Sequence, residues 1–115
     1  MKTKKGVILA GLHPVMRPVL VAAESTWRLL GRPEGATITS GLDGVHSAGS
    51  LHPYGMALDF RTRYFSPDET ASAAMRLRDK LGIDYQVVVE KDHIHVEPAD
   101  HVVSKIFALV GAKWD

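Results

Sequence analysis

Hydrophobic residues recur at helical spacing in two stretches of the chain, and each stretch has signals that mark its ends. The first helix is expected to begin between Pro14 and Pro18, because proline is tolerated in a first helical turn. Its apolar positions are Met16, Leu20, Ala23, Trp27 and Leu30. Gly31-Arg32-Pro33 follows and ends the helix. This spacing predicts a helix with one face in the core.

The second helix is expected from Ser66 to about Leu81. Ser66 and Glu69 have the spacing of a capping box, and Pro67 occupies the first helical position. The residues predicted for its buried face are Ala74, Leu77 and Leu81, and Gly82 ends it. A final helix is expected over residues 102–110, with Trp114 pinning the terminus.

Other stretches alternate between apolar and polar residues, as half-buried strands do. In residues 56–62, Leu58 and Phe60 point to one face while Asp59 and Arg61 point to the other. Residues 93–97 alternate likewise, with His93, His95 and Glu97 on the polar face. Residues 85–90 are expected to form a strand joined to this one by a tight turn at Lys91-Asp92, and residues 36–39 another.

The remaining segments show no linker, so a single domain is expected over residues 1–115. Residues 7–12 are apolar enough for a short edge strand or a packed arm, and periodicity does not decide between them. Residues 40–49 are rich in Gly and Ser and predict a loop. The fold class is therefore α+β, a small, mainly antiparallel sheet with helices packed on one face and polar chemistry on the other.

Composition excludes several classes of function. The 115 residues are 45% hydrophobic, which suits one compact domain, and the formal net charge of +1 gives no general field for nucleic acid or an anionic membrane. The chain has no cysteine, so disulfides, thiolate metal sites and thiol nucleophiles are excluded. The apolar run near the start is short and is broken by His13, Pro14 and Arg17, so we expect mature chain there rather than a signal peptide.

The polar face of the predicted sheet gathers candidate metal ligands. Two neighbouring strands would bring Asp59 and His95 together, and His52, in the loop before the first strand, would complete the group. Two imidazoles and one carboxylate are the ligand set of a catalytic zinc site, whereas calcium and magnesium prefer oxygen ligands. Iron also takes two histidines and a carboxylate, so the residues alone leave zinc and iron open.

Two motifs resemble those of a known enzyme family. Ser50-x-His52-x-x-Gly55-x-Ala57-x-Asp59, followed by Glu90-x-Asp92-His93-x-His95, is similar to the zinc D-Ala-D-Ala carboxypeptidase and L-alanoyl-D-glutamate endopeptidase family. This family is part of the group that includes lysostaphin-type peptidases and the hedgehog signalling domain. The resemblance spans residues 37–97. Within the family, this segment is similar to small phage or prophage cell-wall peptidases, the endolysins.

The resemblance implies a role for each matching residue. His52, Asp59 and His95 match the three ligands of one zinc ion per chain. Asp92 matches the carboxylate that serves as general base, and Glu90, at the other side of the same turn, is its rival. His93 matches a histidine that assists near the metal without binding it.

The resemblance also implies how substrate would be bound. Ser50 matches a serine that contacts substrate, and Gly55 and Ala57 match small residues that allow close approach to the metal. Many relatives carry an arginine soon after the pair that corresponds to Ser40-Gly41, but residues 42–46 contain none. His46 or Arg61 would therefore have to bind the peptide or stabilise the oxyanion.

These implications give the expected function. We expect a zinc-dependent peptidase that hydrolyses peptidoglycan stem peptides, either at a terminal D-Ala-D-Ala bond or at an L-Ala-D-Glu bond. We also expect a monomer without nucleic-acid or membrane partners, cytoplasmic in the producing cell and active on the cell wall once released. The alternative is a non-catalytic, zinc-stabilised binding module of the hedgehog-like type. The acidic residues Asp92 and Glu90 favour the enzyme, because such a module needs neither.

Overall fold

A five-stranded sheet forms the centre of the structure, a computed structural model that describes residues 1–43 and 49–111. The strand order is β1-β2-β3-β5-β4, with β1 (Lys2–Thr3) parallel to β2 (Thr37–Ser40) and the other neighbours antiparallel. The central and far strands are β3 (Leu58–Arg61), β5 (His93–Pro98) and β4 (Tyr85–Val89). The predicted α+β class and mainly antiparallel sheet are confirmed.

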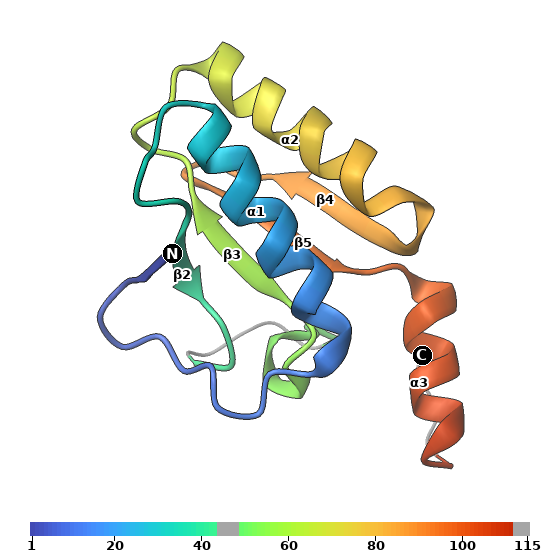
Figure 1. The fold of residues 1–115 in the computed structure, drawn as a ribbon. Helices are drawn as coiled ribbons and strands as arrows, with labels where there is room; N and C mark the ends of the chain where they lie inside the picture. The colour runs from blue at the N-terminus through green and yellow to red at the C-terminus, as the bar shows by residue number, and fades with distance from the viewer. Residues whose placement is uncertain (44–48, 112–115) are drawn as a thin grey trace.

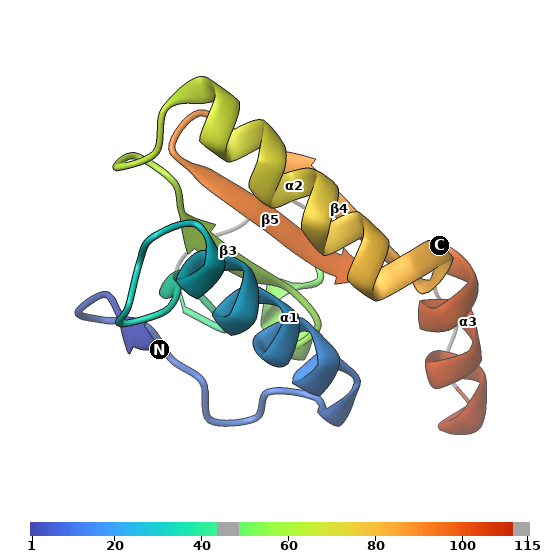
Figure 2. The ribbon, with the colours of Figure 1, turned by 45° about the horizontal axis from the view of Figure 1, so that its top comes forward.

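Two helices cover one face of this sheet (Figure 1). They are α1 (Arg17–Leu29), which follows the short 3₁₀ helix η1 (Pro14–Met16), and α2 (Pro67–Leu81), which has the predicted capping box at Ser66. Figure 2 shows α1 and α2 on the same side of the strands, with α3 (Asp100–Leu109) apart from them. The main helices thus lie where the sequence places them, although α3 begins two residues earlier than expected. Trp114 lies outside the described residues.

The core lies between these helices and the sheet. Trp27 of α1 is fully buried, and its ring centroid is 5.7 Å from that of Phe60 and 5.6 Å from that of Phe65. Other fully buried members from the helices and central strands are Met16, Val19, Leu58, Leu77, Ile94 and Val96. Each such side chain stabilises the fold by about 1.5–3 kcal/mol. Because strand residues alternate, this burial directs Asp59 and His95 to the face that the helices leave open.

The N-terminal segment forms a packed arm, one of the two expected alternatives. Val7, Leu9 and Leu12 are partly buried against the core without joining the sheet. The strand at the edge is instead β1, which the sequence does not predict because its two residues are too short to show a period. Backbone N–H groups of Lys2 and Lys4 donate to the carbonyls of Ala36 and Ile38 at 2.9 and 2.8 Å.

α3 packs apart from the helix face and supports the segment that carries His52. A second apolar cluster joins it to the chain around η2 (His52–Tyr54), and its buried members are Leu51, Met56, Ala57 and Val103. The Phe107 ring of α3 meets the Tyr54 ring edge-on, with 5.3 Å between the centroids. The apolar side of α3 thereby fixes one side of the η2 segment.

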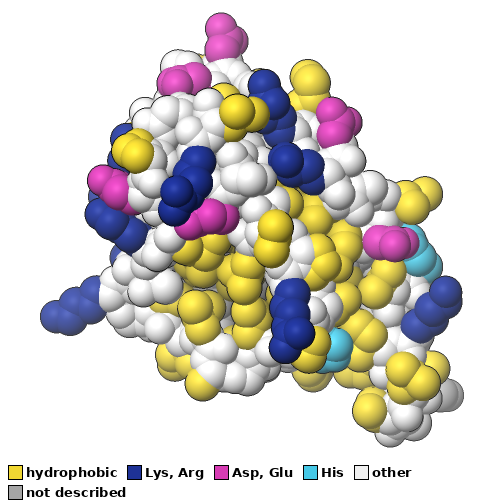
Figure 3. Space-filling view, viewed as in Figure 1, with side chains coloured by type: hydrophobic (Ala, Val, Ile, Leu, Met, Phe, Trp, Pro, Cys, Tyr) yellow, Lys and Arg dark blue, Asp and Glu magenta, His cyan; other side chains and the backbone are white. Residues whose placement is uncertain are grey.

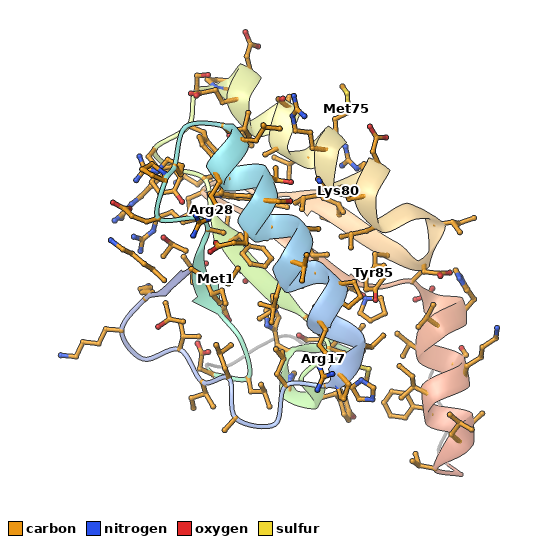
Figure 4. All side chains as sticks on the ribbon, in the orientation of Figure 1. Met1, Arg17, Arg28, Met75, Lys80 and Tyr85 are labelled. Atoms are coloured by element: carbon orange, nitrogen blue, oxygen red, sulfur yellow. The ribbon has the colours of Figure 1, made fainter. Side chains whose placement is uncertain are left out.

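The outer surface of the helix layer is mixed in charge. Figure 3 shows basic and acidic side chains spread over this face among hydrophobic ones, in keeping with the formal net charge of +1. At its edge, the Met1 ammonium group and Arg28, both labelled in Figure 4, contact the Glu24 carboxylate at 2.8 and 3.4 Å. None of the described helices is both long enough and apolar enough to cross a membrane.

Substitution of Gly55 tests the contact between the arm and the η2 segment. Gly55 and Gly31 both have positive φ, 71° and 93°, so alanine at either position meets the cost of left-handed backbone, about 1–2 kcal/mol. A Cβ at Gly55 would also lie 2.4 Å from the Gly11 carbonyl oxygen, whereas one at Gly31 would meet nothing within 4 Å. Overpacking adds to the backbone cost, so we expect Gly55→Ala to lose about 2–5 kcal/mol in urea unfolding and Gly31→Ala only the smaller amount. Equal losses of unfolding free energy in the two variants would show that the arm moves aside without cost and that the contact at Gly55 is not a tight one.

Candidate metal centre

The pairing of β3 with β5 places the first two candidate ligands opposite each other. Asp59 pairs directly with His95 in the antiparallel ladder. The Nδ1 atom of His95 lies 2.8 Å from Oδ1 of Asp59. Phe60 and Ile94, their neighbours in the sequence, are fully buried on the other side of the sheet. The two polar side chains therefore share the open face, as the alternating pattern predicts.

His52 approaches the same carboxylate from the η2 segment. Its side chain is 4% exposed, and its Nε2 lies 3.4 Å from Oδ1 of Asp59. Its other ring nitrogen, Nδ1, lies 2.7 Å from the carbonyl oxygen of Gly41. A carbonyl oxygen can only accept, so Nδ1 carries the proton and donates it. In the neutral ring, Nε2 on the side of Asp59 then keeps its lone pair, which is the tautomer that a metal ligand needs.

These three side chains form a group that could hold a metal ion. One ligand atom from each of His52, Asp59 and His95 lies within 4.8 Å of the others. Three protein ligands leave a coordination position open in tetrahedral geometry, as catalytic rather than structural zinc sites do. The structure thus brings together the three ligands that the sequence predicts.

Without a metal ion, the charges around His52, Asp59 and His95 favour a proton on the His95 ring. Burial raises the pKa of the Asp59 carboxyl, but hydrogen bonds and the charges of His52 and His95 outweigh burial and hold it well below its usual range. Burial lowers the pKa of His95, but hydrogen bonds to Asp59 and Glu97 outweigh it and raise that pKa to about 9. A metal ion must displace this proton from Nδ1, so metal affinity should rise as the pH rises toward that value.

Glu97 fixes the orientation of His95 from the outer side. The Nε2 atom of His95 lies 2.7 Å from Oε1 of Glu97, two positions along β5. Because a carboxylate accepts, Nε2 donates its proton there, and Nδ1 is the nitrogen that faces Asp59. Such a carboxylate partner holds the ring and increases its basicity as a ligand.

Asp43 supports His52 indirectly, through Gly41, and the sequence did not predict this role. Its Oδ1 accepts hydrogen bonds from the backbone N–H groups of Ile8 and Gly41, both at 2.9 Å. Burial raises the pKa of Asp43, but these backbone donors outweigh burial and lower it. Gly41 has no room for a side chain, because a Cβ there would lie 2.4 Å from the Ile8 carbonyl oxygen. Its own carbonyl is the group that accepts the proton of His52.

The candidate catalytic residues lie on two sides of the β4–β5 turn. Asp92 accepts a hydrogen bond at 2.7 Å from Nδ1 of His93, and Nε2 of His93 lies 3.7 Å from Oδ2 of Asp59. The hydrogen bond from His93 is the main reason that the pKa of Asp92 is lowered. Asp92 and His93 line a hollow of about 250 Å³ together with Asp59. Glu90 lines a different hollow, with Phe65 and Thr70. The structure therefore brings Asp92 and His93 to the ligand group and places Glu90 elsewhere.

The candidate substrate-binding residues have separate positions. Arg61 pairs with His93 across β3 and β5 and lines the same hollow. Ser50 accepts a hydrogen bond from the backbone N–H of His52 at 3.2 Å, so it holds the ligand segment in place. Gly55 is the left-handed residue that ends η2, and Ala57 is fully buried. His46 lies outside the described residues.

Comparisons with known proteins add no family to this description. A scan with protein-family models finds no match, and searches of curated proteins and of solved structures find no relative of this chain.

Substitution of Asp43 tests the support of His52. Asp43→Ala removes the acceptor that holds Gly41, so the carbonyl partner of His52 shifts and metal affinity should fall about 10–100-fold, as for other outer partners of metal ligands. Asp43→Asn keeps an oxygen acceptor and should lose less. Competition with a chelator gives the affinity, and Asp79→Ala, an exposed position of α2, is the matched control. A folded Asp43→Ala protein with the affinity of the wild type would contradict the assignment.

Proposed function

We propose that this protein is a zinc-dependent peptidase that hydrolyses peptidoglycan stem peptides. The observation that carries the proposal is the position of the Asp92–His93 pair beside the ligand group. A metal-stabilised binding module has no need of an ionised carboxylate there, whereas hydrolysis of an amide needs a proton acceptor close to the attacking water. The ligand set and both motifs are those of the zinc peptidase family that the sequence resembles.

Zinc is the metal that we assign to the group. His52 through Nε2, His95 through Nδ1 and Asp59 through its carboxylate would hold it, a donor set that zinc accepts readily. Iron accepts the same set, and the motif resemblance is what favours zinc over iron. A zinc ion bound there would supply Lewis acidity, polarising the scissile carbonyl and making a water molecule more acidic.

The chain's own residues would supply the proton transfers. Asp92 is ionised at neutral pH, because its pKa is lowered by the hydrogen bond from His93. One of its carboxylate oxygens would accept the proton of the attacking water and then deliver it to the leaving amine. His93 restrains the Asp92 carboxylate from one side through its Nδ1 atom at 2.7 Å, while its Nε2 faces Oδ2 of Asp59. The pair is thus held in position before substrate binds.

The bond that is cut decides the class of peptidase. Mass spectrometry of purified muropeptides digested with the zinc-loaded protein identifies it directly. Loss of one alanine residue indicates a D,D-carboxypeptidase, and separation of the stem between L-Ala and D-Glu indicates an endopeptidase. If a zinc-loaded, folded protein leaves all muropeptides intact, the proposal of peptidase activity is wrong and the binding-module alternative gains support.

Neutral substitutions distinguish the two acidic candidates at the turn. We expect Asp92→Asn to keep its zinc and fold while its turnover falls about 10²–10⁴-fold, the usual effect of removing a general base. Glu90→Gln should lose much less, because Glu90 lines a different hollow. Zinc content is measured in both variants, since metal loss would imitate a catalytic defect. A zinc-loaded Asp92→Asn protein with nearly full activity, beside an inactive Glu90→Gln protein, would assign the base to Glu90.

A further inference from the structure

Three cationic side chains line the hollow beside the metal centre. Lys4 comes from the segment after β1, Arg61 from β3 and Arg63 from the chain just beyond β3. Thr39 and Ser40 of β2 line the hollow between them, and Asp59 and His93 connect it to the metal centre. Segments that are distant in the sequence thus direct positive charge into one space of about 250 Å³ next to the ligand group.

These three cations have no acidic partner within residues 1–43 and 49–111, where no ion pair or side-chain hydrogen bond involves them. Two other arginines, by contrast, have partners. Arg28 pairs with Glu24 at 3.4 Å, and Arg78 donates to the Val87 carbonyl at 2.8 Å. Lys4, Arg61 and Arg63 are therefore three cations that line one hollow without an acidic partner among the described residues.

The two acidic residues that line the same hollow have histidine partners. Asp59 faces His52 and His95 through Oδ1, and Asp92 accepts from His93. Neither carboxylate forms an ion pair with the three cations, so an anion that enters the hollow can bind to them. Guanidinium groups bind carboxylates through paired, charge-assisted hydrogen bonds, which are among the stronger polar contacts of proteins.

We propose that Lys4, Arg61 and Arg63 form a subsite for a free carboxylate of the substrate, on the residue that supplies the leaving amine. The proposal rests on the proposed peptidase function. Asp59, one of the candidate metal ligands, lines the hollow. A peptide bond held at the metal centre would therefore place the next residue within reach of the hollow, since consecutive Cα atoms are about 3.8 Å apart. The subsite supplies cationic contacts where residues 42–46 lack an arginine. Lys4 lies outside the stretch that carries the motifs, so the motifs alone do not assign it.

In both candidate substrates, the residue that supplies the leaving amine carries a free carboxylate, although a different one in each. A terminal D-Ala carries its own C-terminal carboxylate. A D-Glu residue linked through its γ-carboxyl group keeps a free α-carboxylate. In each case the charge is on the residue that follows the scissile bond, so the subsite would admit either substrate and disfavour peptides that lack a charge there.

Paired acid and amide substrates test the subsite and identify the source of the carboxylate. One pair is a stem pentapeptide ending in D-Ala-D-Ala and the same peptide with a C-terminal amide. The other pair has D-Glu or its α-amide after L-Ala. With the zinc-loaded protein, amidation of the recognised carboxylate should raise KM about 10–100-fold. In Arg61→Gln/Arg63→Gln this preference should largely disappear, and in Lys4→Gln it should decrease. Lys80→Gln, on α2 of the opposite face (Figure 4), should keep it.

A binding measurement separates failure of the subsite from failure of the peptidase. Titration of the zinc-loaded protein with N-acetyl-D-alanine and with its amide needs no turnover, and a carboxylate that binds only to zinc would bind the double variant equally well. A preference for the acid that the double variant loses supports the subsite even if no muropeptide is cut. Hydrolysis of acid and amide substrates at equal KM, or an acid preference that survives in the double variant, overturns the subsite and leaves the peptidase standing. Absence of binding by either probe also overturns it.

Discussion

The register between β3 and β5 is the constraint on which the site depends. A shift of one residue in either strand would turn Asp59 or His95 into the core and bring Phe60 or Ile94 to the open face. Such a shift would expose large apolar side chains that are now fully buried and would bury a charge, each at a cost of about 1.5 kcal/mol or more. The hydrophobic core under α1 and α2 therefore determines where the polar ligands lie. Stability and the candidate metal centre depend on the same alternation of residues.

The third ligand depends on tertiary contacts rather than on the sheet. His52 is held by α3 packing on one side of its segment and by the Gly41 carbonyl on the other. Gly41 is in turn held by Asp43, which also binds the N-terminal arm at Ile8. Three segments that are remote in the sequence thus set the direction of one imidazole nitrogen. This arrangement places the ring before any metal binds, which reduces the rearrangement that binding requires.

Local sequence signals predicted the parts of the structure that depend on local rules. Alternation placed Asp59 and His95 on one face, and the capping box at Ser66 located the start of α2. The sequence did not predict β1, because a two-residue strand has no readable period. It did not predict the role of Asp43 either, because an aspartate just before a glycine is typical of any turn. The sequence also did not predict the basic hollow, since Lys4 is brought to Arg61 and Arg63 only by the fold. Contacts between distant segments leave little trace in one sequence.

The central claim is that His52, Asp59 and His95 hold one zinc ion, and metal content tests it most directly. Elemental analysis of the purified protein, after dialysis against metal-free buffer with zinc restored at one equivalent, should find one zinc ion per chain. His95→Ala and His52→Ala should lose it, because each removes one of three ligands. His101→Ala should keep it, since His101 lies on α3 and pairs with Asp84 at 2.8 Å, apart from the ligand group. Equal zinc content in the wild type and in a folded His95→Ala protein would contradict the account.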